Sequence, residues 1–180
     1  MARLAEGNGE TRQVRERMLT AAISRDDLPD PPTPDMLRLL IVRAQVRVLS
    51  DAPALVVLDY EAALEHAELL TDEQRGVALR GLTLAYLADR RLEDAFNQAA
   101  TLLKPEGELV EGAAADPLVE GLIASARSAA AQGRKDDAAQ VLSGIRTLLG
   151  QAISADLDAV LLEVQAEIER EDEPDEPEAE

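Results

Sequence analysis

The sequence predicts an all-α protein made of antiparallel helical hairpins. Helix start signals recur along the chain, apolar residues follow them with helical period, and no segment alternates between apolar and polar residues as a strand does. The chain has only two tyrosines, one phenylalanine and no tryptophan, so the core must consist of Leu, Val, Ile and Ala. Such a core favours closely packed helices. The 180 residues suit one domain or one elongated repeat array.

The first two segments are expected to be a short helix and a linker. Residues 1–24 contain one helix that Thr11 can cap, with an apolar side formed by Val14, Met18, Ala21 and Ala22. Residues 25–34 carry four prolines, which fix φ and remove backbone donors, so this segment is predicted to be an extended, semi-rigid linker.

Residues 35–150 are expected to form the main helical domain, because its helices begin at recognisable signals. Thr33 precedes Pro34, which places an N-cap hydroxyl before a first-turn proline. Thr71 and Gln74 fit a capping box, in which each side chain binds the other residue's amide. The predicted helices cover about 34–49, 53–70, 72–88, 91–103, 117–132 and 134–149, with one long loop at 104–115.

The C-terminal part is predicted to be a capping helix followed by an acidic tail. Gly150 is a typical helix stop, and the segment 151–170 contains a final helix from about 155. One side of that helix is apolar and suited to cover an exposed end of the array: Leu157, Val160, Leu161, Val164 and Ile168. Residues 171–180 are rich in acids, contain no base and are expected to be disordered.

Three stretches share an acidic residue or two followed by a small residue: "LDYEAAL", "RLEDAF" and "RKDDAA". Their small residues, Ala63, Ala95 and Ala138, are about 32 and about 43 residues apart, and the excess matches the loop after Leu103. The best unit is "AYLADRRLEDAF", with Ala85 and Tyr86 before the turn. Helical hairpins that repeat at this interval resemble the tetratricopeptide repeat, a helix–turn–helix unit of about 34 residues.

The resemblance implies a short right-handed solenoid with an N-terminal helix and a C-terminal capping helix. Its alternative is a generic antiparallel helical bundle in which the alanine spacing is coincidental. Tetratricopeptide proteins are mostly protein-binding scaffolds whose first helices line a concave groove. Aligning the two better repeats on that pattern predicts an apolar groove with two arginines that face a ligand: Val77, Arg80, Leu84, Leu87, Ile123, Arg127 and Ala130, with Glu120 alongside.

The sequence carries no catalytic signature and no cofactor motif. His66 is the only histidine and no cysteine is present, so neither a multi-histidine metal site nor a thiolate site can be assembled. Paired acids such as Asp136 and Asp137 are expected in so acidic a chain and are interpreted as solvated helix starts. Arg38, Arg43 and Arg47 lie in a predicted helix without acids after its first turn and are expected to pair with acids on neighbouring helices.

The net charge of −18 opposes the phosphate neutralisation that nucleic-acid binding requires, so direct nucleic-acid binding is not expected. No long apolar segment predicts membrane insertion, and the sequence suggests a cytoplasmic protein. Alanine richness and the predominance of Arg over Lys are typical of GC-rich bacterial genomes. The oligomeric state cannot be read from the sequence.

The sequence therefore predicts a non-catalytic adaptor or scaffold that binds a protein partner, in the form of a peptide or amphipathic helix. Two alternatives stay open. One is an acidic chaperone or mimic that shields a basic protein, and the other is an enzyme of unrecognised type. Strong salt dependence of binding would distinguish the acidic chaperone or mimic.

Overall fold

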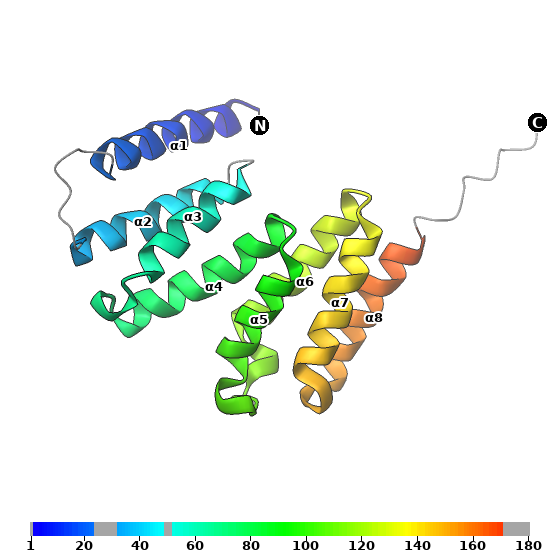
Figure 1. The fold of residues 1–180 in the computed structure, drawn as a ribbon. Helices are drawn as coiled ribbons and strands as arrows, with labels where there is room; N and C mark the ends of the chain where they lie inside the picture. Colours follow the sequence, from blue (N-terminus) through cyan, green and yellow to red (C-terminus); the bar gives the residue numbers. More distant parts are fainter. Residues whose placement is uncertain (1, 24–31, 49–51, 171–180) are drawn as a thin grey trace, which may run out of the picture. The chain divides into compact units, whose positions relative to one another are not determined.

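The computed structural model describes residues 2–23, 32–48 and 52–170, and every regular element within these ranges is helical (Figure 1). This confirms the predicted all-α class. Most of the predicted linker and the whole acidic tail lie outside the described residues.

The chain divides into two compact units, Met1–Arg91 and Leu92–Glu180. The division falls inside the segment 35–150 that the sequence analysis treated as one domain. It also falls between the two helices of the best repeat unit, so each unit is described by itself.

Over its described residues, the first unit contains four α-helices and one short 3₁₀-helix. α3 packs against both α2 and α4, and α1 packs against α2. The elements are α1 (Ala2–Ile23), α2 (Pro34–Arg47), α3 (Pro53–Leu64), the 3₁₀-helix η1 (Ala67–Leu69) and α4 (Asp72–Ala88).

Two predicted helix starts in this unit are confirmed. The Thr33 hydroxyl accepts a hydrogen bond from the Met36 amide at 3.3 Å, directly before the first-turn Pro34 of α2. At α4 the capping box is complete: the Gln74 amide donates to the Thr71 hydroxyl at 3.2 Å, and the Thr71 amide donates to Gln74 Oε1 at 3.0 Å. Local side chains therefore satisfy amides that the helices leave unpaired.

Two predicted boundaries in this unit are wrong. α1 begins at Ala2 and not at Thr11, because the helix-forming Ala, Leu and Glu residues before Thr11 outweigh the two glycines among them. α3 ends at Leu64, short of the predicted position 70. His66 leaves helical geometry, and the turn that follows brings Leu70 back into the core, where its exposed fraction is only 6%.

The core of the first unit is formed by Leu, Val, Ile and Ala, as the composition requires, together with Tyr60. The Tyr60 ring lies directly against Gly81 in α4, where a Cβ atom would collide with the ring. Tyr86 also joins α3 and α4, because its hydroxyl donates to Glu61 at 3.0 Å while the Arg91 guanidinium lies 4.3 Å from its ring centre. The remaining core residues are mainly Leu37, Leu40, Ile41, Ala44, Val56, Val57, Ala63, Ala78, Leu82 and Ala85.

A buried ionic cluster joins the first three helices. Asp59 of α3 is only 3% exposed, and its carboxylate accepts bonds from Arg43 at 2.6 Å and Arg47 at 2.9 Å, both from α2. Arg47 also contacts Glu16 of α1 at 2.9 Å. The expected pairing with acids on neighbouring helices is confirmed for Arg43 and Arg47, and their pairs are far more buried than ordinary surface ion pairs.

The second unit packs α6 against α7 and covers both with α8, while α5 contacts α7. The Asp116 carboxylate accepts from the Leu118 amide at 2.9 Å, which confirms the predicted start of α6. Gly133, at φ 71°, turns the chain between α6 and α7, which run antiparallel in Figure 1. The α-helices are α5 (Leu92–Leu103), α6 (Pro117–Ala131), α7 (Lys135–Leu149) and α8 (Ala155–Arg170).

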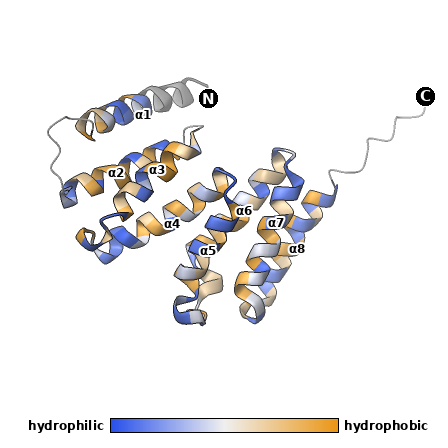
Figure 2. Ribbon diagram, in the orientation of Figure 1, coloured by the Kyte–Doolittle hydropathy of each residue, from blue (hydrophilic) through white to orange (hydrophobic). Residues whose placement is uncertain are grey.

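The capping stripe of α8 is confirmed in its central part. Leu161, Val164 and Ile168 are buried against the rest of the unit, whereas Leu157 and Val160 are half-buried. Figure 2 shows hydrophobic and hydrophilic residues interleaved along α7 and α8, which is the pattern of helices buried on one side. The predicted loop at 104–115 contains two short 3₁₀-helices, η2 (Pro105–Gly107) and η3 (Ala113–Ala115).

Candidate functional site

A groove of about 510 Å³ lies between α5 and α7 in the second unit. The two helices run in the same direction (Figure 1), so the groove follows both helix axes. Lys104 lines it directly after α5, and its lining residues on α5 recur at helical spacing: Leu92, Glu93, Phe96, Asn97 and Ala100. Those on α7 do the same: Gln140, Ser143, Gly144, Thr147 and Leu148.

The base of the groove is set by Phe96 and Gly144. An added Cβ atom at Gly144 would overlap the Phe96 ring, so only glycine permits this close approach of the ring to the α7 backbone. A glycine in the middle of α7 destabilises the helix, since glycine is about 1 kcal/mol less favourable than alanine there. The close packing of the Phe96 ring explains why glycine occupies this position.

The lining of the groove is apolar at its centre and polar along its edges. Phe96, Ala100 and Leu148 are buried or half-buried, whereas Ser143 and Thr147 are exposed. The only charged residues among those that line it are Glu93 at one end of α5 and Lys104 at the other. Such a lining suits a ligand with an apolar stripe and polar flanks, which is what one face of an amphipathic helix presents.

No family model, curated protein or solved structure matches this chain.

Four of the predicted groove residues lie on α4 in the first unit. Val77 and Arg80 are exposed, Leu84 is half-buried, and Leu87 is buried with an exposed fraction of 5%. The Arg80 guanidinium lies beside Gly76, one turn earlier, at 3.3 Å from where a Cβ atom would stand. Of the four predicted groove residues on α4, a ligand can therefore reach Val77, Arg80 and part of Leu84.

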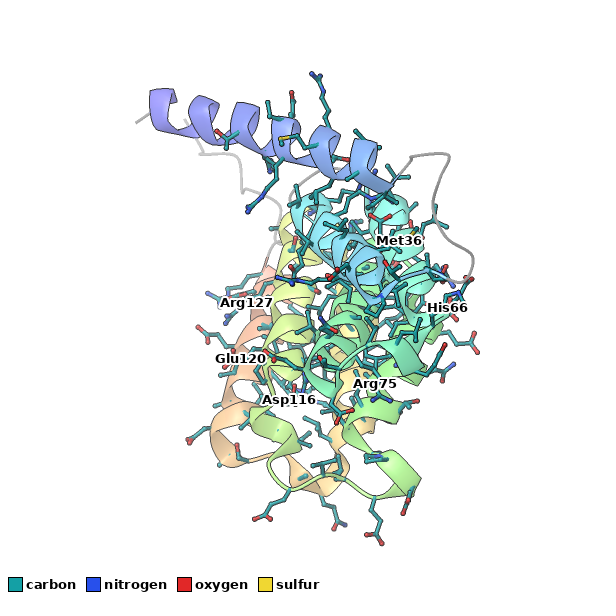
Figure 3. All side chains as sticks on the ribbon, turned by 90° about the vertical axis from the view of Figure 1, so that its left-hand side faces the viewer. Met36, His66, Arg75, Asp116, Glu120 and Arg127 are labelled. Carbon is teal, nitrogen blue, oxygen red and sulfur yellow. The ribbon has the colours of Figure 1, made fainter. Side chains whose placement is uncertain are left out.

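The other three predicted groove residues lie on α6 in the second unit. Ile123 and Ala130 are buried, at 8% and 6% exposed, so neither offers much surface to a ligand. Arg127 is exposed and extends from the same side of α6 as Glu120 (Figure 3). It already has acidic partners on α8, with Glu163 at 3.5 Å and Glu167 at 3.6 Å, although the repeat alignment predicts that it faces a ligand.

His66 occupies the turn after α3, is half-buried, and has its Nδ1 3.7 Å from the Glu68 carboxylate. In the part of the chain that the structure describes, no three residues among His, Asp and Glu are placed to hold a metal ion. Over the same residues, no helix combines the length and the apolarity needed to cross a membrane.

The α5–α7 groove was not predicted from the sequence. Phe96 was noted as part of a repeat unit, but Gly144 carries no local signal, because a single glycine inside a helix is also tolerated for other reasons. The hydrophobic pattern of α7 does not mark the groove either, because most of its lining residues there are polar, namely Gln140, Ser143 and Thr147.

Proposed function

We propose that this protein is a non-catalytic adaptor that binds a helical segment of a partner protein in the α5–α7 groove. The observation that supports the proposal best is the groove itself, with its Phe96 ring held against Gly144. Binding in such a site needs only burial of apolar surface and a few polar contacts at the edges.

The dimensions of the groove agree with one helix as ligand. From Glu93 on α5 to Lys104 just after it, the lining covers about three turns, or about 16 Å at 1.5 Å per residue. A ligand helix of similar length would place its apolar side on Phe96, Ala100 and Leu148 and its flanks on Asn97 and Thr147.

The fold favours the same class of function. The antiparallel α6–α7 pair, with Gly133 at its turn and buried Ala126 and Ala138, has the small residues expected of a tetratricopeptide-like hairpin. In this proposal such hairpins are stacked in a short solenoid. The α4 surface around Arg80 and the α6 surface around Arg127, each predicted to contact a ligand, then remain further places where a partner can bind.

The test fills the groove without disturbing the core. Ser143 is an exposed lining residue of α7, so Ser143→Trp should occupy the groove while circular dichroism stays unchanged. Thr101→Trp is the matched control, since Thr101 is exposed on α5 and does not line the groove. Tagged forms of the wild type and both variants are used to capture proteins from a lysate of the source cells, followed by quantitative mass spectrometry.

Partners that depend on the groove should be retained by Thr101→Trp and reduced at least about tenfold by Ser143→Trp, equivalent to about 1.4 kcal/mol. Capture that is equal for all three forms argues against the groove. Partner proteins that are lost instead from the double variant Arg80→Glu/Arg127→Glu would point to the surfaces predicted around these two arginines. Capture abolished by salt alone, whatever the variant, favours the acidic chaperone or mimic.

A further inference from the structure

The outward side of α1 is an apolar stripe that nothing in the described chain covers. Val14 is 54% exposed and Met18 69% exposed, and Ala21 and Ala22 are exposed beside them. The opposite side of α1 faces α2, with Ile23 buried and Glu16 bound to Arg47. The four residues predicted to share one side of this helix thus form the side directed away from the core.

The stripe matches the α5–α7 groove in length and in its apolar character. Val14 to Ala22 spans about 12 Å of helix, which is within the roughly 16 Å between Glu93 and Lys104. The stripe has a long methionine between smaller side chains, and Met adapts readily to an irregular apolar surface such as that around Phe96.

The charges at the ends of the two surfaces are complementary. Arg15 and Arg17 are exposed on either side of the stripe, toward its N-terminal half. The groove has Glu93 at the start of α5, and the first turn of α7 adds the exposed Asp136 at the same end. If α1 lies parallel to α5, its arginines meet these acids, and its C-terminal carbonyls, with their partial negative charge, lie near Lys104.

We infer that the α5–α7 groove binds α1 of a second copy of this chain, with Val14 and Met18 against Phe96 and Leu148. This inference rests on the proposed function of the groove and names its occupant. Each copy offers this stripe and this groove, so the contact is heterologous, and it either closes into a ring or leaves a free stripe and a free groove at the ends of an open assembly.

The association is expected to be weak and to depend on concentration. One helix in one groove buries less than the roughly 1,200 Å² typical of stable complexes. We therefore expect a Kd on the order of 100 μM, weakened by salt because the arginine–acid contacts are exposed. Sedimentation equilibrium of the full chain between about 10 μM and about 1 mM measures it.

Two single-surface variants test the contact. Val14→Gln with Met18→Gln removes the apolar stripe and keeps a groove, whereas Ser143→Trp fills the groove and keeps a stripe. Each should be monomeric at concentrations where the wild type associates. Leu58→Gln with Leu162→Gln is the matched control, because these exposed apolar residues belong to neither surface, and it should associate as the wild type does.

Mixing the two defective variants gives the decisive result. The stripe of Ser143→Trp can enter the groove of Val14→Gln/Met18→Gln, but neither end can then add another copy. The mixture should therefore form a one-to-one dimer and nothing larger. A wild type that stays monomeric at about 1 mM, a mixture that stays monomeric, or variants that associate like the wild type would overturn the inference.

These outcomes are separable from failure of the proposed function. Foreign partners that are captured through the groove, while the wild type remains monomeric, leave the adaptor proposal standing and remove α1 as the occupant. Self-association through the groove without any groove-dependent foreign partner supports the inference and restricts the function of the groove to assembly.

Discussion

The Phe96 ring rests on the α7 backbone at Gly144, at a distance that leaves no room for a side chain. The same device occurs in the first unit, where Tyr60 rests on Gly81 of α4. In both pairs an aromatic ring takes the place that a side chain on the facing helix would occupy. The chain has three aromatic residues, two tyrosines and one phenylalanine, and two of the three pack against a glycine in this way.

Gly144→Ala should destabilise the protein, although alanine is the better helix former. The propensity gain is about 1 kcal/mol, whereas displacing the Phe96 ring from a packed position costs about 1 to 3 kcal/mol. We expect a lower urea midpoint with an unchanged m-value. Gly76→Ala is the control, because its Cβ would meet only the flexible Arg80 tip at 3.3 Å, and this variant should be neutral or slightly more stable.

Asp59→Asn should be one of the most damaging single substitutions in the first unit. It removes the buried negative charge that Arg43 and Arg47 share, and breaking a buried ion pair typically costs about 3 to 5 kcal/mol. Chemical denaturation followed by circular dichroism measures the loss. Glu163→Gln, which breaks an exposed pair with Arg127, should cost at most about 1 kcal/mol; equal losses for both variants would contradict the distinction.

The protein should lose stability at alkaline pH through Tyr60. Burial, and secondarily the adjacent Asp59 carboxylate, raises the pKa of Tyr60 from 10.0 to about 12. Because the folded-state pKa lies above the unfolded value, the stabilising contribution is complete below pH 10 and is lost as the pH rises to about 12. A shift of this size corresponds to roughly 2 to 3 kcal/mol.

Urea midpoints measured between pH 9 and pH 12 test this prediction, with Tyr60→Phe as the matched variant. The phenylalanine ring keeps the contact with Gly81 but cannot ionise. Its midpoint should therefore fall less steeply over this pH range than that of the wild type. Parallel curves for the two proteins would show that another group controls the alkaline transition.

Glu16→Gln should loosen α1 without unfolding the rest of the first unit. The substitution removes the carboxylate that contacts Arg47 at 2.9 Å, while Ile23 still packs in the core. Hydrogen exchange should become faster in α1 and stay unchanged in α3 and α4. Uniformly faster exchange would mean that α1 is part of the cooperative core rather than a separately docked helix.

The helices themselves were largely predictable because their signals are local. Thr33, Thr71 and Asp116 each satisfy amides within three residues, so a short stretch of sequence contains the whole interaction. The end of α3 was not predictable in this way. It is set by where Leu70 must return to the core, and that position depends on α2 and α4.

The candidate site was not predictable because its parts are distant in sequence. Phe96 and Gly144 belong to different helices, and nothing near either residue indicates the other. The apolar side of α1 illustrates a related limit. Val14 and Met18 were correctly grouped on one side, but Leu19 and Ile23 form a second apolar side, and only packing determines which of the two faces the core.

In the ionic cluster of the first unit, α1 supplies one of the negative charges that balance the arginines. Arg43 and Arg47 bring two positive charges to a site where Asp59 supplies one negative charge, and Glu16 of α1 supplies the other. The cluster is electrically neutral only while α1 is docked. Dissolved anions can compete for that role, so raising the ionic strength should release α1 before it affects the apolar core, and the helix that carries Met18 is then free to move together with its stripe.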